Sequence, residues 1–335
     1  MRVSLITGSV PPYPCGVGGF TEKLAEELRA QGVEVALVTG LDWSAFSANS
    51  SRKQIAAASP DIVHIQYPTR GYRWSLGPHA LSLSMKTVVT LHEFSQVHLL
   101  RTLSSMAFLL RSQMVFTTEF ERASAQKWAP WIEGRSRVIP IANIVDRYQG
   151  APLPRSGVAY FGLLRPKRGL EDFLEFARLL HSKSPELPIR IVGGEVPYAR
   201  DYPERLRSSA AGVPIEWHVN KSEAEVARLL SISEFAYLPF PEGATERRTT
   251  LIGAMVNGCV IISNGGVQSP ARLIDAIEIA ASPTEACESI LKLQADRNKL
   301  EALRNRGESY IQQFKIENVA KAHIALYAEL LSAKV

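Results

Sequence analysis

The stretch from Phe235 to Asn264, FAYLPFPEGATERRTTLIGAMVNGCVIISN, constrains the fold most, because it changes from apolar to charged and back to apolar. Residues 235–240 predict a short buried strand, and the Pro-Glu-Gly sequence after them breaks it. The apolar residues that follow Thr249 predict a short buried helix, and residues 259–262 predict a second strand. A strand, a loop, a helix and a strand in succession are typical of a parallel sheet covered by helices.

The start of this predicted helix has the composition of an anion site. Arg247, Arg248, Thr249 and Thr250 stand there together. The first backbone N–H groups of a helix have no partner within the helix, and its dipole is positive at that end, so a phosphate is stabilised there. Arginine side chains add charge-assisted hydrogen bonds. An ordinary solvated and capped turn is the alternative, but the two arginines and two hydroxyls favour a phosphate-binding loop.

The same alternation of strands and helices occurs along the rest of the chain. Residues 3–7 predict a strand, residues 20–30 an amphipathic helix and residues 33–39 a second strand, which together form a βαβ unit. The polar residues 142–156 show no periodicity and predict a linker, after which the pattern restarts. With 335 residues the chain is long enough for two cores, so it predicts two doubly wound α/β domains in tandem.

Polar side chains stand where several predicted strands end. In open parallel sheets ligands bind beyond the carboxyl ends of the strands. We therefore expect Tyr13, Gln66, Tyr67, His92 and Glu93 to lie near a ligand.

Composition narrows the class of protein. Hydrophobic residues make up 46% and charged residues 21%, as in soluble globular proteins. The chain opens without the pattern of a signal peptide, and three scattered cysteines give neither a disulfide framework nor a metal site, so we expect a cytoplasmic protein. The net charge of +5 arises in residues 1–155, which hold 16 Lys and Arg against 11 Asp and Glu. This surplus is compatible with an anionic partner or with a plain solvated surface, and no nucleic-acid motif accompanies it.

The stretch Leu99–Leu110, LLRTLSSMAFLL, is apolar between two arginines. It has the composition of a helix that could lie on a membrane surface, which would place the protein at the inner face of the membrane. A helix packed in the core is the alternative that we favour here.

Five segments in order resemble the family-four glycosyltransferases of the GT-B fold, over nearly the full length of the chain. They are PPYPCGVGGFTEKLAEELRAQGVEVALVT, DIVHIQYP, VVTLHEFS, FGLLRPKRGLEDFLEFARLL and PFPEGATERRTTLIGAMVNGCVII. The resemblance implies two Rossmann-like domains that face each other across a cleft. It implies an acceptor-binding domain over 1–150, a donor-binding domain over 155–315 and a last helix, 316–335, that crosses back to the first domain.

The resemblance also implies an activity. It implies a retaining, metal-independent hexosyltransferase that moves a sugar from a nucleotide-diphosphate sugar, with UDP or GDP as the expected nucleotide, and that needs no further cofactor. The acceptor would be a carbohydrate or a phosphorylated or lipid-linked molecule, such as a glycan, a glycolipid or a natural-product glycoside.

Residue by residue, the resemblance and the strand ends give a candidate site. Catalytic roles are expected for His92, Arg165 and Arg168. Donor binding is expected for Gly18, Gly19, Gly194, Glu195, Glu246, Arg247, Arg248, Thr249 and Thr250, and acceptor binding for Tyr13, Gln66, Tyr67 and Glu93.

Two departures from the family pattern bear on the function. Leu163 stands where an arginine is usual, and the arginine comes two positions later as Arg165. Gly253 stands where the family has a ribose-binding glutamate, which leaves a catalytically weak GT-B partner or scaffold of an active transferase as an alternative. A Rossmann dehydrogenase is disfavoured, because the glycine spacing is wrong and Thr39-Gly40 replaces the acidic residue expected after the second strand.

Overall fold

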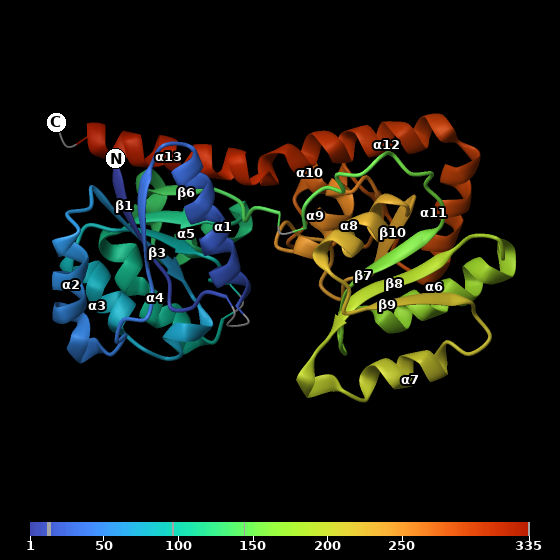
Figure 1. The fold of residues 1–335 in the computed structure, drawn as a ribbon, viewed down its shortest axis with the longest axis horizontal. Coiled ribbons are helices and arrows are strands. Elements are labelled where there is room, and N and C mark those ends of the chain that lie inside the picture. Colours follow the sequence, from blue (N-terminus) through green and yellow to red (C-terminus); the bar gives the residue numbers. More distant parts are fainter. Residues whose placement is uncertain (12–14, 96, 144, 334–335) are drawn as a thin grey trace. The chain divides into compact units, whose positions relative to one another are not determined.

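The computed structural model describes residues 1–11, 15–95, 97–143 and 145–333 and divides into two compact units (Figure 1). Unit 1 contains residues 1–142 together with 313–335, and unit 2 contains residues 143–312. The chain thus leaves unit 1 once, builds unit 2, and returns to unit 1 for its last helix. None of the helices in the described ranges is long and apolar enough to cross a membrane.

Unit 1 is built on a six-stranded parallel sheet with the strand order β2-β1-β3-β4-β5-β6. Its strands are β1 (Arg2–Ile6), β2 (Glu34–Val38), β3 (Ile62–Tyr67), β4 (Val88–Leu91), β5 (Gln113–Phe116) and β6 (Ser136–Val138). Its α-helices are α1 (Gly16–Ala30), α2 (Ala48–Ala57), α3 (Gly77–Ser84), α4 (Leu99–Arg111), α5 (Glu119–Trp128) and α13 (Ile316–Ser332).

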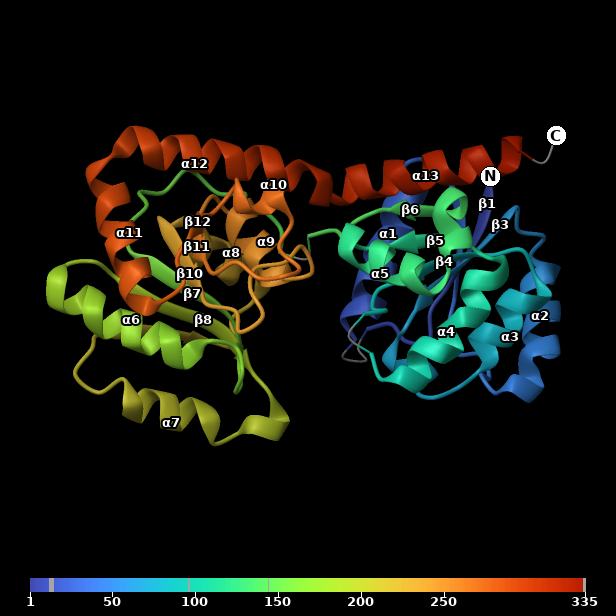
Figure 2. The ribbon, with the colours of Figure 1, turned by 180° about the vertical axis from the view of Figure 1, so that it is seen from behind.

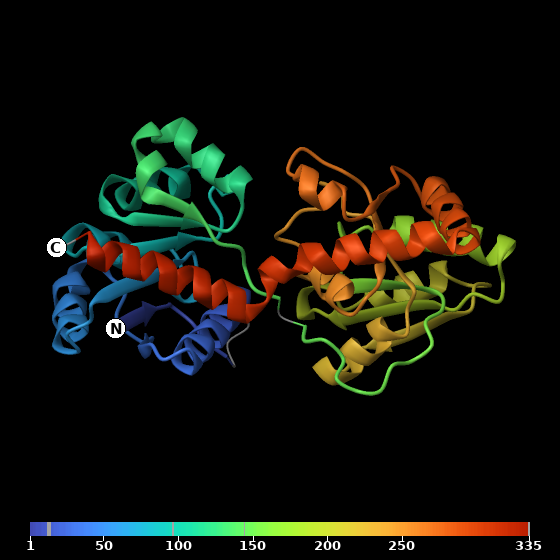
Figure 3. The same cartoon turned by 90° about the horizontal axis from the view of Figure 1, so that it is seen from above.

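Alternation along the strands gives this sheet two apolar faces, each covered by different helices. In β3, Val63, Ile65 and Tyr67 point into one core with side chains from α2, α3, α4 and α5, which Figure 2 shows on the same side of the sheet. The other face carries residues such as Val3 and Leu5 of β1, which pack against α1 and α13. These two helices lie side by side (Figure 3). The last helix is therefore a structural part of unit 1.

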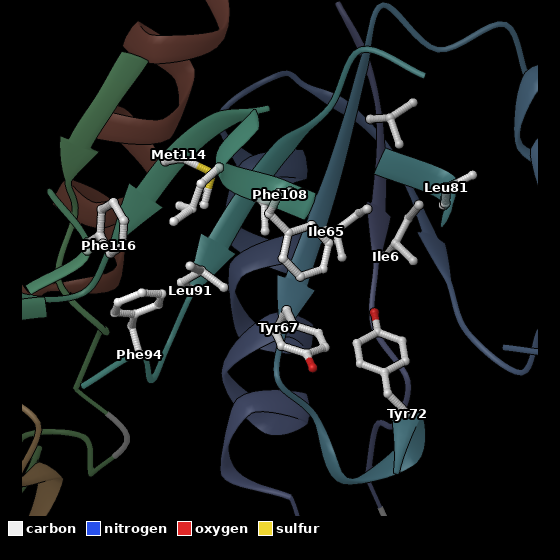
Figure 4. Packing of buried hydrophobic residues seen from close by; sticks show 14 of the residues in the cluster. Ile6, Ile65, Tyr67, Tyr72, Leu81, Leu91, Phe94, Phe108, Met114 and Phe116 are labelled. Atoms are coloured by element: carbon white, nitrogen blue, oxygen red, sulfur yellow. The ribbon is translucent and has the colours of Figure 1, made fainter. Parts of the chain in front are cut away.

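The first of these cores is rich in aromatic side chains. Tyr67 and Tyr72 stack with ring centroids 5.9 Å apart, and Tyr67 meets Phe108 at 5.0 Å. Figure 4 shows Phe94, which follows β4, beside Phe116 of β5. The loops that leave β3 and β4 are thus anchored by buried rings directly after the strand ends.

Unit 2 is built on a second six-stranded parallel sheet, with the order β12-β11-β10-β7-β8-β9. Its strands are β7 (Val158–Leu164), β8 (Ile189–Glu195), β9 (Ile215–Val219), β10 (Phe235–Leu238), β11 (Val260–Ser263) and β12 (Glu278–Ile279). Its α-helices are α6 (Leu170–Lys183), α7 (Tyr202–Ser209), α8 (Glu223–Ser231), α9 (Thr249–Val256), α10 (Ala271–Ile274), α11 (Pro283–Ala295) and α12 (Arg297–Tyr310).

The predicted fold class is confirmed, since both units are parallel sheets covered by helices. Strand positions agree with the sequence patterns to within a few residues. The helix expected over 99–110 is present as α4, but the preferred interpretation as a core helix holds for only one of its faces. Its buried residues are Thr102, Ser105, Phe108 and Leu109, whereas several of its leucines are exposed.

Candidate functional site

The strand order of unit 2 locates a ligand-binding point on its sheet. β7 is the first strand of this unit, β8 continues on one side of it, and β10 pairs on its other side. The strand order reverses between β7 and β10, and in open α/β sheets ligands bind outside the carboxyl ends of the strands at such a reversal. The loops after β7 and β10 hold Arg165, Arg168, Arg247 and Arg248. The topology therefore brings together the two arginine pairs that the sequence has 80 positions apart.

The loop after β7, which carries Arg165 and Arg168, is held in a tight conformation. Gly169 adopts φ 76° just before α6, and a Cβ on it would lie 1.7 Å from the carbonyl oxygen of Pro239, which follows β10. Only glycine fits this close approach of the two loops. The Tyr160 hydroxyl donates to the Arg168 carbonyl at 3.0 Å. The loop is thereby fixed to both strands at the reversal point.

The loop after β10 brings Arg248 to the same place. Arg248 precedes α9, its guanidinium lies over the Phe240 ring at 4.9 Å, and it pairs with the exposed Glu242. Thr249 and Thr250, the first residues of α9, are half-buried. A stacked guanidinium is pre-oriented for a planar, bidentate contact with an anion.

The arginines raise the local positive potential. Burial lowers the pKa of Arg168, and the neighbouring charges of Arg165 and Arg248 lower it further. The charges of the three guanidinium groups therefore act on one another at this end of the sheet. The Nε of Arg165 is buried and has no hydrogen-bond partner among the described residues. An anion with several oxygens would relieve the repulsion and satisfy these donors.

Gly194 and Glu195 lie at the carboxyl end of β8, next to the end of β7. Glu195 is in register with Leu164, directly before Arg165. Asn220, with φ 53°, accepts the Glu195 N–H through its side-chain oxygen at 2.9 Å and fixes this strand end. The two residues therefore border the arginine cluster, and their role in donor binding stays a prediction.

Glu246 is turned toward the interior of unit 2. The Tyr310 hydroxyl of α12 donates to the Glu246 carboxylate at 2.7 Å, and burial raises the pKa of Glu246.

Gly253 lies on the buried face of α9, where close packing favours a residue without a side chain. A Cβ there would stand 3.1 Å from the Cβ of Val145 and 3.4 Å from the Phe161 ring. A side chain at position 253 would require Val145 to shift by a few tenths of an ångström, and glycine itself supplies no side chain for a ribose contact.

In unit 1, His92 directly follows β4 and is buried, whereas Glu93 is exposed. The Nε2 of His92 lies 2.8 Å from the side-chain oxygen of Gln66, and the backbone N–H of His92 donates to the Tyr67 carbonyl at 2.8 Å. The Phe20 ring of α1 meets the imidazole edge-on at 5.7 Å.

Behind Gln66, a chain of buried polar groups runs to the last helix. The Gln66 amide nitrogen lies 3.2 Å from Nε2 of His64, which also lies 2.7 Å from the Thr90 hydroxyl. On the other side of the ring, Nδ1 of His64 lies 2.6 Å from the hydroxyl of Tyr327 in α13. With the Gln66 amide so oriented, His92 carries its proton on Nε2 and His64 carries its proton on Nδ1.

The other predicted residues of unit 1 are placed as follows. Gly18 and Gly19 belong to the first turns of α1, which begins at Gly16, four residues before its predicted start. A Cβ on Gly18 would lie 2.3 Å from the Ser9 carbonyl oxygen, whereas nothing lies within 4 Å of a Cβ on Gly19. Tyr67 lies in the core described above. Tyr13 falls outside the described residues.

One residue that the sequence patterns did not single out supports the loop after β4. The buried carboxylate of Glu121 in α5 accepts the backbone N–H groups of Phe94 and Ser95, each at 2.8 Å, and the Ser95 hydroxyl at 2.8 Å. The only signal for it is its position in the first turn of a helix after a strand, which is common to many helices.

No protein-family model matches the sequence, and no curated protein matches it. Solved structures do. Sucrose-phosphate synthase from Thermosynechococcus elongatus superposes with a TM-score of 0.72 at 16% identity, over 99% of this chain and 100% of that one. HepE from Anabaena, in complex with UDP, superposes with a TM-score of 0.73 at 13% identity, over 99% and 100%. A glycosyltransferase from Rickettsia africae gives a TM-score of 0.72 at 14% identity, over 98% of each chain.

The chain has the GT-B fold. The superpositions span both units, so the tandem order of two Rossmann-like units is shared as well as each sheet. At these identities the likeness establishes the fold, and the reaction depends on the site residues described above.

Proposed function

We propose that the protein is a retaining glycosyltransferase that moves a hexose from a nucleotide-diphosphate sugar to an acceptor hydroxyl. The observation that carries the proposal is the convergence of Arg165, Arg168 and Arg248 at the reversal point of a GT-B sheet. Structural neighbours include HepE in complex with UDP and with UDP-glucose, which supports a nucleotide-sugar donor with UDP as the first candidate.

The proposed chemistry follows from where charge develops. The bond between the sugar C1 and the diphosphate oxygen breaks, and the leaving nucleoside diphosphate gains negative charge. Arg165, Arg168 and Arg248 stabilise this charge, and Thr249 and Thr250 hold the diphosphate at the start of α9. The acceptor oxygen bonds to C1 on the face that the diphosphate leaves, and its proton passes to the leaving phosphate. The product then keeps the anomeric configuration of the donor.

The remaining candidate residues take supporting roles in this proposal. Gly194, Glu195, Glu246 and Arg247 border the donor, and Gly19 leaves room for a close approach of the α1 backbone. His92, whose Nε2 proton is directed at Gln66, accepts a hydrogen bond from a hydroxyl of the transferred sugar through Nδ1. The acceptor is a carbohydrate or a phosphorylated or lipid-linked molecule, for which Tyr13, Gln66, Tyr67 and Glu93 are the predicted contacts.

A thermal-shift screen against UDP-, GDP-, ADP- and dTDP-sugars tests the donor first. We expect one nucleotide series to raise the melting temperature and Arg168→Ala to abolish the rise. The donor that binds is then incubated with the enzyme, and hydrolysis or transfer is followed by NMR of the anomeric proton. Retained configuration agrees with the proposal, and inversion refutes the retaining mechanism. No binding of any nucleotide sugar would refute the transferase and favour the catalytically weak partner or scaffold, and so would donor binding without any turnover.

A further inference from the structure

Helix α4 exposes the residues that a core helix would bury. Leu99, Leu100, Leu103 and Leu110 are 58%, 62%, 49% and 56% exposed. Leu99, Leu103 and Leu110 are four and seven positions apart, which is the spacing of one helix face. The opposite face, which packs on the sheet, holds Thr102 and Ser105 beside Phe108 and Leu109. The helix therefore keeps two small polar residues inside and four leucines outside.

Neighbouring elements extend this apolar face at both ends of the helix. Helices α3 and α4 lie side by side (Figure 2), and the exposed Leu83 of α3 accepts a hydrogen bond from Arg111 through its carbonyl. The exposed Trp74 lies under Arg101, whose guanidinium is 4.8 Å from its ring. Trp131, half exposed, donates its indole N–H to the Leu109 carbonyl at 3.0 Å. We call the four leucines of α4 with Trp74, Leu83 and Trp131 the α4 surface.

The α4 surface is bordered by positive charges that no carboxylate neutralises. Arg101 donates to the Arg73 carbonyl, Arg111 to the Leu83 carbonyl, and Arg135 to the carbonyls of Leu109 and Leu110. Within the described residues, none of the three forms an ion pair with Asp or Glu. Residues 70–135, which contain every residue of the α4 surface, hold eight Lys and Arg against four acidic residues.

We propose that the α4 surface docks on an anionic lipid bilayer. A helix with leucines on its outer face, tryptophans at both ends and arginines along its border matches the requirements for binding in the plane of a membrane interface. Leucines enter the acyl boundary, indole rings lie at the depth of the headgroups, and guanidinium groups bind lipid phosphates. The length of α4, 13 residues, corresponds to roughly 20 Å of contact along the surface.

Charge favours a bilayer over a second copy of this chain. In a symmetric dimer through the α4 surface, the arginines of one copy would face those of the other without carboxylates between them, and like charges so placed repel. An anionic lipid surface instead supplies the opposite charge along the whole border. Docking does not depend on nucleotide-sugar chemistry, so its test and the test of transferase activity can fail separately.

The test measures binding of the full chain to vesicles by co-sedimentation. One set of vesicles contains phosphatidylcholine alone, and the other also contains about 30% phosphatidylglycerol. This anionic lipid content gives a negative surface potential of tens of millivolts. We expect binding to the anionic vesicles to be at least about tenfold stronger than to neutral ones, and to weaken as salt is raised. Brominated lipids should quench the fluorescence of Trp74 and Trp131 but not that of Trp217 in unit 2. Single Trp→Phe variants identify the contribution of each tryptophan to the fluorescence.

Matched variants separate the α4 surface from general hydrophobicity and charge. Leu103→Gln with Leu110→Gln should weaken vesicle binding by about tenfold or more. Leu153→Gln with Val267→Gln, which changes two exposed apolar residues of unit 2, should leave it unchanged. Arg111→Gln should reduce the salt dependence, whereas Lys53→Gln on α2 should not. Circular dichroism confirms that each variant folds.

Three outcomes would overturn the proposal. The first is absence of binding to anionic vesicles, and the second is equal binding by the leucine pair variant and the parent. The third is a concentration-dependent dimer in analytical ultracentrifugation that Leu103→Gln with Leu110→Gln dissociates, since the α4 surface would then be an interface between copies.

Discussion

Acidification should destabilise unit 1 much more than unit 2, because unit 1 buries several histidines in neutral form. His79 of α3 is 5% exposed, stacks on Phe108 at 4.4 Å, and has no hydrogen-bond partner for either ring nitrogen among the described residues. Burial, and next the charge of Arg101, lower the pKa of His79 to about 4. Burial also lowers the pKa of His323 in α13 to about 4 and places the pKa of His64 well below its usual value.

The size of the effect follows from proton linkage. The ordinary pKa of histidine, and hence that of the unfolded chain, is about 6.5, so between pH 6.5 and 4 the unfolded chain binds more protons than the folded one. The stability is thus fully present above pH 6.5 and is lost as the pH falls toward 4. At pH 5, His79 and His323 each lower the free energy of unfolding by about 2 kcal/mol. Together they lower it by about 4 kcal/mol, a change of roughly a thousandfold in the unfolded fraction.

The assay must report each unit separately, because a two-domain protein need not unfold in one step. Guanidinium titrations at pH 7 and pH 5, read by pulsed hydrogen exchange and mass spectrometry of peptides from each unit, give this resolution. We expect the midpoint of unit 1 to fall sharply at pH 5. Unit 2, whose two histidines His181 and His218 lie outside its core, should shift much less.

A pair of variants tests whether the buried imidazoles are the cause. His79→Leu should reduce the shift by the part that His79 contributes, about 2 kcal/mol at pH 5. It should not lower stability at pH 7, since it replaces two unpartnered nitrogens with apolar atoms. His98→Gln, at an exposed position of unit 1, should leave the shift unchanged. The reasoning is refuted if unit 1 and unit 2 lose stability equally, or if His79→Leu retains the full shift.

Four further results are expected from the proposed site and its surroundings. Arg168→Ala should weaken binding of the nucleoside diphosphate by roughly 1.5–3 kcal/mol in calorimetry, the scale of a hydrogen bond to a charged group, while Arg178→Ala on α6 should not; equal affinity of both variants would remove Arg168 from the site. Because the sequence has no Asp-x-Asp motif, turnover in EDTA should equal turnover in magnesium, and loss that manganese restores would contradict the metal-independent mechanism. His92→Ala should bind nucleotide almost normally but lose about ten- to a thousandfold in turnover, and a lower melting temperature with turnover per folded molecule intact would assign His92 to the core alone. Tyr327→Phe leaves Nδ1 of His64 without its acceptor and should lower the melting temperature and also turnover per folded molecule, whereas a purely structural Tyr327 would lower only the former.

Much of the fold was predictable because periodicity is a local property of the sequence. Most strands of the two sheets show as short apolar runs, and glycines or polar loops separate them from the helices. The helices that sequence patterns missed are those with a weak apolar stripe. Helix α2, ANSSRKQIAA, buries only Ser51 and Ile55, and α7, YPERLRSS, buries Tyr202, Pro203 and Leu206. Their positions depend on the surfaces they cover, which a local pattern does not contain.

The site was predictable to the extent that it follows from strand ends. Arg165 and Arg248 come after the two strands that flank the reversal of strand order, so topology alone brings them to one point. The orientation of each side chain was harder to predict from the sequence. Glu246 is half-buried and accepts a hydrogen bond from Tyr310, 64 positions later, and Gly253 lies close to Val145, which precedes the sheet of unit 2.

The pair Gln66 and Tyr67 illustrates what position along a strand leaves out in physical terms. Both come at the end of β3, and that shared position suggested a shared role at the acceptor. Successive residues of a strand point to opposite faces, however, so a shared strand end cannot give both side chains the same surroundings. Tyr67 enters the aromatic core with Phe108, whereas Gln66 joins His92 and His64 on the face covered by α13. A contact between the strand and the last helix, 263 positions away, thus sets the environment of Gln66. Of the two, Gln66 is the one whose replacement should reach the proposed sugar-binding histidine, whereas replacement of Tyr67 should first disturb its packing on Phe108.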